Sequence, residues 1–251
     1  MPRVISLLNF KGGTGKSSLA ENLSHALAIA GHRVLVIDAD RQSNASTTLL
    51  AGQMTPTLTD VLMKHARLQE AIFPARENLF VVPADTNLDQ ASRHIVAADP
   101  RRGYYTLRDA LAQLTDFEYV LIDHAGAYTP VMEAALLASG EMLIPCELES
   151  YAVQGLFSMF EKLQDALSDH EITNSGIVPY NVDLRYSMAR QYLRELRETF
   201  NGLVTAPVRT DATVPRAQSV RQTVFEYDAK SKVAEDFRTL AEDLIAEEVQ
   251  S

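Results

Sequence analysis

The chain has 251 residues, of which 46% are hydrophobic and 22% charged, which is enough apolar material for one full core and excludes a disordered chain. Its formal net charge of −10 argues against a surface that is basic all round and binds nucleic acid everywhere. The single cysteine, Cys146, excludes an intrachain disulfide and a four-cysteine metal site, and without a signal-peptide pattern or a long apolar run we expect a soluble, cytoplasmic protein.

Strand-like and helix-like patterns alternate along the whole chain. Strands are predicted at the short apolar runs Val4–Asn9, Val34–Asp38, Leu79–Pro83, Tyr119–Asp123, Met142–Pro145, Ser175–Val178 and Leu203–Val208. Helices are predicted where apolar residues recur at helical spacing, at Ser17–Ala30, Leu58–His65, Tyr105–Leu114, Pro130–Ala138, Ala152–Leu167, Ser187–Phe200 and Lys232–Glu248. This alternation predicts an α/β fold: a doubly wound, mostly parallel sheet with helices on both faces, in a single domain over residues 1–251.

A glycine-rich segment, Lys11–Ser18, joins the first predicted strand to the first predicted helix. Glycines let backbone N–H groups converge on phosphate oxygens, and the N-terminus of the helix adds its positive end. The pattern predicts a phosphate site in which Lys16 reaches the β- and γ-phosphates, the Ser17 hydroxyl ligates Mg²⁺ and Ser18 donates to the α-phosphate. The rest of this cradle is assigned to Gly12, Gly13, Thr14 and Gly15.

The segment departs from the strict phosphate-loop pattern, because Phe10 stands where the first glycine is expected and a second lysine, Lys11, follows it. The string Lys11-Gly-Gly-Thr-Gly-Lys16-Ser17 resembles the deviant Walker A box of the ParA/MinD family of P-loop ATPases, which belong to the SIMIBI class. The resemblance implies ATP and Mg²⁺ as cofactors and a catalytic role for Lys16. It also implies that Lys11 crosses the interface of an ATP-dependent homodimer to reach the partner's nucleotide.

The second predicted strand ends in Asp38-Ala-Asp40, followed by Arg41-Gln-Ser43. This segment resembles the D-x-D-P-Q-G switch box of the family, with Arg41 and Ser43 in place of its proline and glycine. The resemblance implies that Asp40 orients the attacking water and that Asp38 supports the magnesium and lysine network. Because the changes remove a fixed φ and an easy left-handed position, we expect them to affect turnover more than binding.

The run Tyr119–Asp123 predicts a Walker B strand, whose Asp123 holds Mg²⁺ through a water; the alternative is a carboxylate that caps a turn. The proline-rich turn usual in the family is replaced by His124-Ala-Gly126, and we expect His124 to be an exposed loop residue without a catalytic role. Asn181 stands where the family offers an asparagine to the adenine edge, although an ordinary turn asparagine fits the pattern almost equally well.

Residues 185–232 contain nine basic and five acidic residues, so this segment is net positive in an acidic chain. Such segregation suits a surface that binds DNA phosphates without sequence preference, although solvated helix faces also account for it. In the family, ATP-bound ParA dimers bind nucleoid DNA through basic residues of this region. The candidates in this chain are Arg185, Arg190, Arg216 and Arg221, of which Arg216 and Arg221 are preferred.

Taken together, the resemblance implies a slow, partner-stimulated ATP hydrolase that partitions a plasmid, chromosome or other large cargo with a ParB-like or other adaptor protein. We expect no N-terminal helix-turn-helix domain and no stable membrane association, and we expect the ATP-bound form to be associated with the nucleoid. The alternatives are a MinD-like positioning ATPase, which the acidic C-terminal helix does not favour, and a metabolic enzyme of the wider superfamily. A nitrogenase-reductase-like enzyme would need more cysteines than Cys146.

Overall fold

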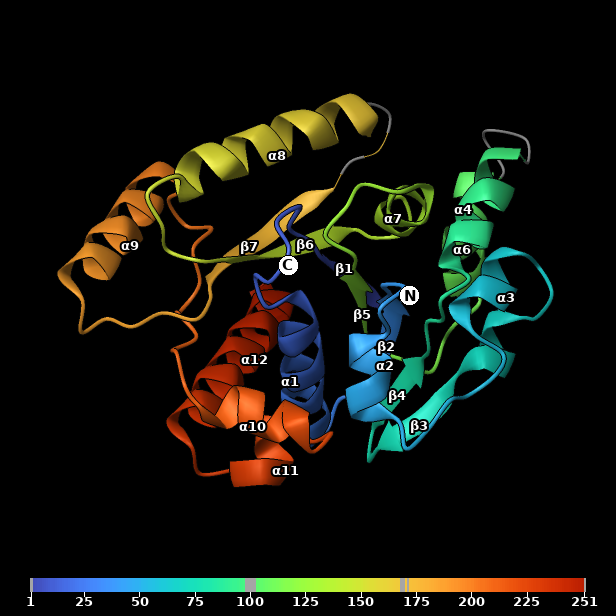
Figure 1. Ribbon diagram of the computed structural model, residues 1–251, viewed down its shortest axis with the longest axis horizontal. Coiled ribbons are helices and arrows are strands. Elements are labelled where there is room, and N and C mark those ends of the chain that lie inside the picture. The colour runs from blue at the N-terminus through green and yellow to red at the C-terminus, as the bar shows by residue number, and fades with distance from the viewer. Residues whose placement is uncertain (1, 98–102, 168–169, 171, 251) are drawn as a thin grey trace.

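A twisted sheet of seven strands forms the centre of the computed structural model, which describes residues 2–97, 103–167, 170 and 172–250 (Figure 1). The strand order is β3-β4-β2-β5-β1-β6-β7, and every pair is parallel except β3 and β4. The strands are β1 (Arg3–Leu7), β2 (Val34–Ala39), β3 (Phe73–Arg76), β4 (Leu79–Val82), β5 (Tyr119–His124), β6 (Glu141–Cys146) and β7 (Thr173–Pro179). The predicted doubly wound, mostly parallel fold is confirmed.

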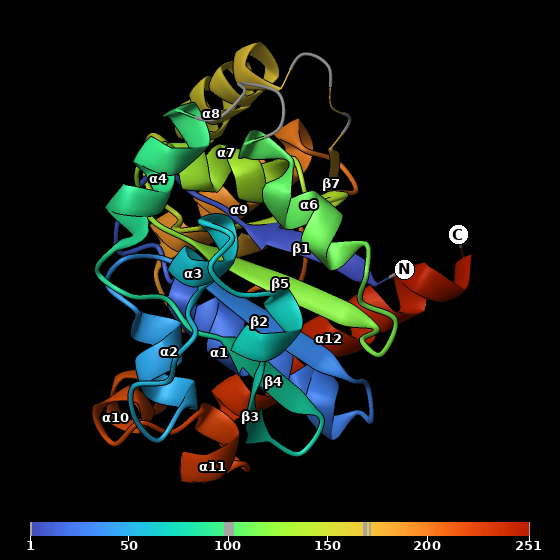
Figure 2. The same ribbon diagram turned by 90° about the vertical axis from the view of Figure 1, so that its right-hand side faces the viewer.

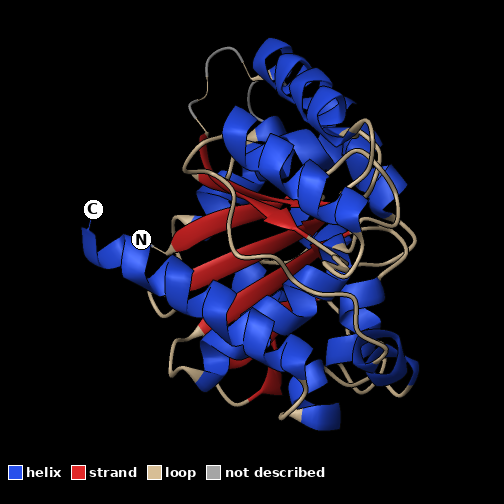
Figure 3. Cartoon of the chain, turned by 90° about the vertical axis from the view of Figure 1, so that its left-hand side faces the viewer, coloured by secondary structure: helices blue, strands red, loops and turns tan. Residues whose placement is uncertain are grey.

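Helices cover both faces of this sheet (Figures 1 and 2). The first face carries α1 (Lys16–Ile29), α2 (Asn44–Leu49), α10 (Thr213–Ser219), α11 (Val224–Asp228) and α12 (Lys232–Gln250). The second face carries α3 (Leu58–Leu62), the short 3-10 helix η1 (Leu68–Ala71), α4 (Leu88–Ala97), α6 (Thr106–Leu111), α7 (Pro130–Leu136), α8 (Ala152–Ala166) and α9 (Ser187–Thr199). Figure 3 shows α12 running along the sheet.

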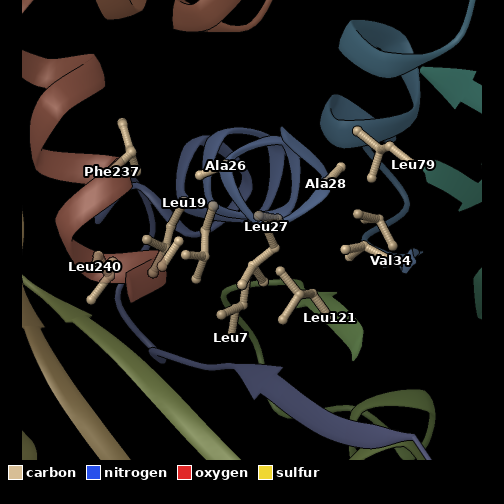
Figure 4. Close-up of a cluster of buried hydrophobic side chains, with 14 of the residues drawn as sticks. Leu7, Leu19, Ala26, Leu27, Ala28, Val34, Leu79, Leu121, Phe237 and Leu240 are labelled. Carbon is tan, nitrogen blue, oxygen red and sulfur yellow. The ribbon is translucent and has the colours of Figure 1, made fainter. Parts of the chain in front are cut away.

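The strands are continuously apolar because each is buried from both sides. Successive side chains of a strand point to opposite faces, so Val34 and Val36 of β2 join the core under α1 while Leu35 and Ile37 join the core under α3 and α4. In Figure 4, Leu27 of α1 faces Leu7 and Leu121 of the sheet, and Leu19 lies on the side of α1 that is nearer to α12.

The last helix, α12, docks on the core through a stripe of apolar residues along one of its faces. Val233, Phe237 and Leu240 are at most 1% exposed and belong to the same buried cluster as Leu19 and Leu27 of α1. Cys146 is buried. No helix in the described part of the chain combines the length and the apolar character needed to cross a membrane.

The sequence prediction is wrong at one strand and misses several short elements. Residues 203–208 do not form a strand; Val204 makes a single parallel bridge to Ile177. The antiparallel edge strand β3 was not predicted, since Pro74 interrupts a run of only four residues. The helices α2, α4, α10 and α11 were also missed; α2, α10 and α11 are too short to show a helical period.

Candidate functional site

The loop between β1 and α1 has the backbone geometry of a tight phosphate cradle. Gly13 and Gly15 adopt left-handed φ values of 78° and 88°, which glycine tolerates without strain. A Cβ on Gly15 would lie only 2.2 Å from the Tyr180 ring, so this glycine also lets Tyr180 of the segment after β7 close against the loop. The loop leads directly into α1, whose first turn is Lys16 to Leu19.

Lys16 is held inside the loop rather than extended into solvent. It is 7% exposed, and its Nζ donates to the carbonyl oxygen of Lys11 at 3.2 Å. Burial lowers the pKa of Lys16, whereas the charges of Asp123 and Asp40 oppose this shift. The ammonium group is therefore already placed where the glycine loop would receive phosphate oxygens.

Asp38 and Asp123 lie side by side at the ends of two adjacent strands. They are register partners of β2 and β5, and Leu7, before the loop, is the partner of Asp123 in β1. Both carboxyl groups are completely buried, and burial raises the pKa of Asp38 to about 6 and that of Asp123 well above its usual range. The three strand ends thus place two desolvated carboxyl groups under the glycine loop.

The two aspartates differ in their hydrogen bonds. The Oδ2 of Asp38 accepts from the backbone N–H and the hydroxyl of Ser46 at 2.8 and 2.6 Å, and its Oδ1 accepts from the backbone N–H of Asp40 at 3.1 Å. Neither oxygen of Asp123 accepts a hydrogen bond of normal geometry from a described residue, although the Ser17 hydroxyl lies close enough to favour its charged form. Asp123 is therefore the carboxylate with free acceptor capacity.

A divalent cation at this position could take the free carboxylate oxygens of Asp123 and the neighbouring Ser17 hydroxyl as ligands. Within the described residues, no three acidic, histidine or cysteine side chains cluster closely enough to hold a metal alone. The donor set fits Mg²⁺, which keeps several waters and takes further oxygens from a bound phosphate. Asp38, committed to Ser46, is better placed to orient its neighbours than to ligate the metal directly.

The loop after β2 keeps the left-handed residue that its sequence appeared to have lost. Ser43 adopts φ 54°, so a serine occupies the conformation that glycine would take more easily. Asp40 lines the cavity beside the loop, and its Oδ1 accepts from the backbone N–H of Gln42 at 2.9 Å. The exposed Arg41 reaches Asp89 on α4 at 3.1 Å.

His124 is not an exposed loop residue, contrary to the sequence prediction. It is the last residue of β5 and is completely buried, with its Nε2 2.8 Å from the hydroxyl of Ser6. That hydroxyl lies 2.7 Å from the hydroxyl of Ser139, which donates to the carbonyl oxygen of Ala135 at 2.9 Å. Burial and the nearby charge of Lys16 lower the pKa of His124 to about 3, so the imidazole is neutral at physiological pH.

Lys11, the second lysine of the loop, extends to the segment that follows β6. Its Nζ lies 2.8 Å from Glu149 and 3.5 Å from Glu147, and its side chain is half exposed. These ion pairs raise the pKa of Lys11, led by the hydrogen bond to Glu149. Because such exposed pairs contribute little free energy, Lys11 can exchange these partners for others at low cost.

A cavity of about 1150 Å³ extends from the glycine loop to the segments after β7. Asn181, which has φ 58°, lines it together with residues 209–212, and the Thr210 hydroxyl donates to the Asn181 carbonyl oxygen at 2.7 Å. The cavity thus brings Asn181 and the loop to one site. The size of this cavity and its position beside the glycine loop suit a nucleotide.

Glu21 is a feature of the site that sequence reasoning missed. It lies on α1, lines the cavity, is 1% exposed, and burial raises its pKa to about 7. A signal was present, because it is the only acidic residue in a helix otherwise rich in alanine and leucine. A helix that is apolar on most sides is buried, and its few charges are buried with it.

The four candidate DNA-binding arginines are exposed but differ in their partners. Arg185 pairs with Asp183 at 2.6 Å, and Arg190 donates to the carbonyl oxygens of Leu184 and Arg185. Arg216 on α10 and Arg221 after it make no ion pair with a described residue. The latter two cations are therefore the more available for an external anion.

Comparisons with known proteins agree with this geometry. A family model described as an AAA domain matches residues 2–178. The chromosome partitioning protein ParA of Caulobacter vibrioides is 34% identical over 98% of this chain and 95% of its own length. The sporulation initiation inhibitor protein Soj of Bacillus subtilis is 29% identical over 98% of this chain and 99% of its own. The septum site-determining protein MinD of Pyrococcus horikoshii, complexed with Mg-ADP, superimposes with a TM-score of 0.80 at 25% identity, covering 97% of this chain and 96% of that one.

Proposed function

The chain belongs to the ParA family of P-loop ATPases, and we propose that it forms an ATP-dependent sandwich dimer that binds DNA without sequence preference and partitions a plasmid, chromosome or other large cargo. The observation that carries the proposal is the convergence of Lys16, Asp38 and Asp123 under one glycine loop at the end of a nucleotide-sized cavity. The Mg-ADP complex of the P. horikoshii relative supports ATP and Mg²⁺ as the cofactors.

In this proposal the residues of the loop bind the triphosphate. Backbone N–H groups of Gly12, Gly13, Thr14 and Gly15 surround the phosphates, Lys16 neutralises the β- and γ-phosphates, and the Ser18 hydroxyl donates to the α-phosphate. Ser17 and Asp123 hold Mg²⁺, the latter through a water. Asn181 receives the adenine edge.

Hydrolysis requires a water in line with the γ-phosphate, and Asp40 is the residue proposed to orient it. Asp40 lines the cavity close to Lys16. Its charge opposes the lowering of the Lys16 pKa by burial. Asp38 holds the switch loop through its hydrogen bonds to Ser46 and to the backbone of Asp40. Turnover is slow until an adaptor protein, ParB-like or specific to another cargo, completes the arrangement.

Dimerisation depends on the second lysine. The Lys11 side chain is half exposed, and among the described residues its Nζ contacts only the carboxylates of Glu149 and Glu147. It is therefore free to leave them and to contact the nucleotide of a second copy. The terminal phosphate is then sensed jointly by two protomers. ATP therefore controls assembly, and hydrolysis reverses it.

The DNA surface is assigned to Arg185, Arg190, Arg216 and Arg221, with the last two as principal contacts. Cations that neutralise DNA phosphates release counterions, so binding through them must weaken steeply with salt. The ATP-bound dimer would be associated with the nucleoid. A membrane-directed role like that of MinD is less well supported, because the apolar stripe of α12 is packed against α1.

The proposal is tested by measuring DNA binding with ATP, with ADP and without nucleotide. We expect binding only with ATP, and its loss when Arg216 and Arg221 are changed to Glu. Changing the exposed Lys64 and Arg67, on the loop after α3, to Glu alters the net charge equally and should preserve most of the binding. Binding that is independent of nucleotide, or unchanged affinity and salt dependence in the Arg216→Glu/Arg221→Glu variant, would contradict the proposed DNA surface.

A further inference from the structure

The side chain of Gln218 joins α10 to the helix that begins at the phosphate loop. Its Nε2 donates to the hydroxyl oxygen of Ser18 at 3.0 Å and to Oε2 of Glu21 at 3.1 Å. Ser18 and Glu21 are adjacent on the same face of α1, three residues apart, and both are more than nine-tenths buried. All three residues line the nucleotide-sized cavity.

The chemistry of these groups fixes the direction of the bonds. An amide nitrogen only donates, so the Ser18 oxygen accepts from Gln218 and keeps its own proton for another acceptor. In the proposed function that acceptor is the α-phosphate. Gln218 therefore holds the Ser18 hydroxyl in the orientation in which it can donate to the nucleotide.

The backbone of the same residue supports the basic surface. The carbonyl oxygen of Gln218 accepts from the N–H of Arg221 at 3.0 Å, which closes the turn in which Arg221 has φ 56°. Arg216 lies two residues earlier on the same short helix. One residue thus contacts the phosphate loop helix through its side chain and Arg221 through its carbonyl group.

Two further hydrogen bonds tie the following segment to α1. The Oδ1 of Asn22 accepts from the N–H of Val224 at 2.8 Å, while its Nδ2 donates to the Ser18 carbonyl oxygen at 2.7 Å. The His25 Nδ1 lies 2.6 Å from the Thr223 hydroxyl. Residues 213–224 are therefore held on α1 as a unit. Gln218 connects this unit to Ser18, which is proposed to bind the nucleotide.

We propose that Gln218 is a positioning residue that couples nucleotide binding to the basic surface carried by α10. A phosphate that accepts the Ser18 proton polarises the hydroxyl and strengthens its bond to Gln218, so nucleotide binding favours the docked position of α10. Coupling between binding equilibria is reciprocal, so an anion that holds α10 in this position increases nucleotide affinity by the same factor. The inference rests on the proposed nucleotide site, but it does not require that the anion be DNA.

The test is hydrogen–deuterium exchange of residues 213–224 in the full chain, with and without Mg²⁺ and a saturating nonhydrolysable ATP analogue. In the wild-type protein we expect the nucleotide to slow exchange in this segment. In Gln218→Ala the segment should lose most of this response, and nucleotide affinity should fall by about three- to tenfold, the effect of one neutral hydrogen bond. Gln222→Ala is the matched control, since its side chain makes no hydrogen bond to a described residue, and it should behave as wild type.

A double variant, Glu21→Gln with Gln218→Glu, separates positioning from simple docking. In this variant the new amide on α1 can donate to the new carboxylate on α10, so the hydrogen bond between the two helices is restored. Without nucleotide, the exchange rate of residues 213–224 should therefore equal that of the wild-type protein. The carboxylate at position 218 attracts the Ser18 proton and repels the phosphate, so the nucleotide response should stay absent.

A wild-type response in Gln218→Ala or in the double variant would overturn the proposal. So would an exchange rate of residues 213–224 in the wild-type protein that bound nucleotide does not change. Because exchange is measured without DNA, failure of the proposed DNA binding would leave this result unaffected. Protection of residues 11–18 by the analogue is the separate readout of the nucleotide site.

Discussion

Asp38 and Asp123 are register partners on adjacent parallel strands, and both side chains are completely buried. The pKa of each is raised by burial first, with a neighbouring carboxylate adding to the shift. Without a cation, this pair opposes folding, because like charges in a desolvated site repel each other. A bound Mg²⁺ removes that cost, so the geometry links metal binding to stability.

Asp123→Asn is expected to stabilise the protein in the absence of metal, because it removes a buried charge while preserving shape. We expect the free energy of unfolding at pH 8 to rise by at least about 1 kcal/mol, which corresponds to a pKa raised by a single unit. The same variant should lose the extra stabilisation that the wild-type protein gains from Mg²⁺ with nucleotide. Thermal unfolding with and without Mg²⁺ and nucleotide measures both effects, and an unaltered Mg²⁺ response would remove Asp123 from the metal site.

Gly15→Ala tests the close approach of Tyr180 to the glycine loop. The added Cβ would meet the ring at 2.2 Å in a left-handed conformation, so we expect a loss of at least about 2 kcal/mol in the free energy of unfolding. Gly12→Ala is the stability control, since its Cβ would have no atom within 4 Å and its φ is not left-handed. Equal destabilisation of the two variants in chemical denaturation would contradict the packing described.

His124 predicts a pH dependence of stability. Its pKa is about 3 in the folded protein and ordinarily 6.5, so the unfolded chain binds the additional proton between these values. Stability from this group is complete above pH 6.5 and is lost as the pH falls towards 3. The amide of His124→Gln keeps the donor to Ser6 but does not titrate, so this variant should not show the loss. The free energy of unfolding of the wild-type protein minus that of the variant should therefore fall from pH 7 to pH 4. A constant difference over that range would mean that His124 is not buried as a neutral group.

Glu21 predicts a pH dependence of the opposite sign. Its pKa rises from 4.5 to about 7 on folding, so the folded protein holds the proton more tightly and stability from this group falls as the pH rises through that interval. Glu21→Gln removes the effect, and its advantage over the wild-type protein should grow from pH 4.5 to just above pH 7 by roughly 3 kcal/mol and then level off. Urea denaturation at a series of pH values measures this, and a pH-independent difference would contradict the burial of Glu21.

The elements predicted best were those whose signal is local. Val34–Asp38 and Tyr119–Asp123 are almost continuously apolar, as expected for strands that are buried on both faces. The glycines between the first strand and the first helix indicate a loop with left-handed backbone positions, which the structure has. Residues 203–208 have a similar apolar character but form only one bridge to Ile177, because a sheet edge is decided by its neighbours rather than by composition.

The parts of the site that could not be predicted depend on contacts between distant residues. His124 was expected to be exposed because its neighbours Ala125 and Gly126 suggest a loop, but Ser6 and Ser139 complete a buried hydrogen-bond chain around it. Gln218 is 197 residues from Glu21 and has no motif of its own. At Ser43 the replacement of the family's glycine was visible in the sequence. The sequence did not show that the serine still adopts the left-handed backbone conformation.

The proposed switch requires that the glycine loop bind a triphosphate and that two copies of the chain sense its terminal phosphate together. Sedimentation of the purified protein with saturating Mg²⁺ and a nonhydrolysable ATP analogue tests this most directly. We predict that the 27.8 kDa chain shifts to twice its mass, that Lys11→Ala binds the analogue but stays at the single-chain mass, and that Lys16→Ala does neither. A wild-type protein that remains at 27.8 kDa with no analogue bound would contradict the account.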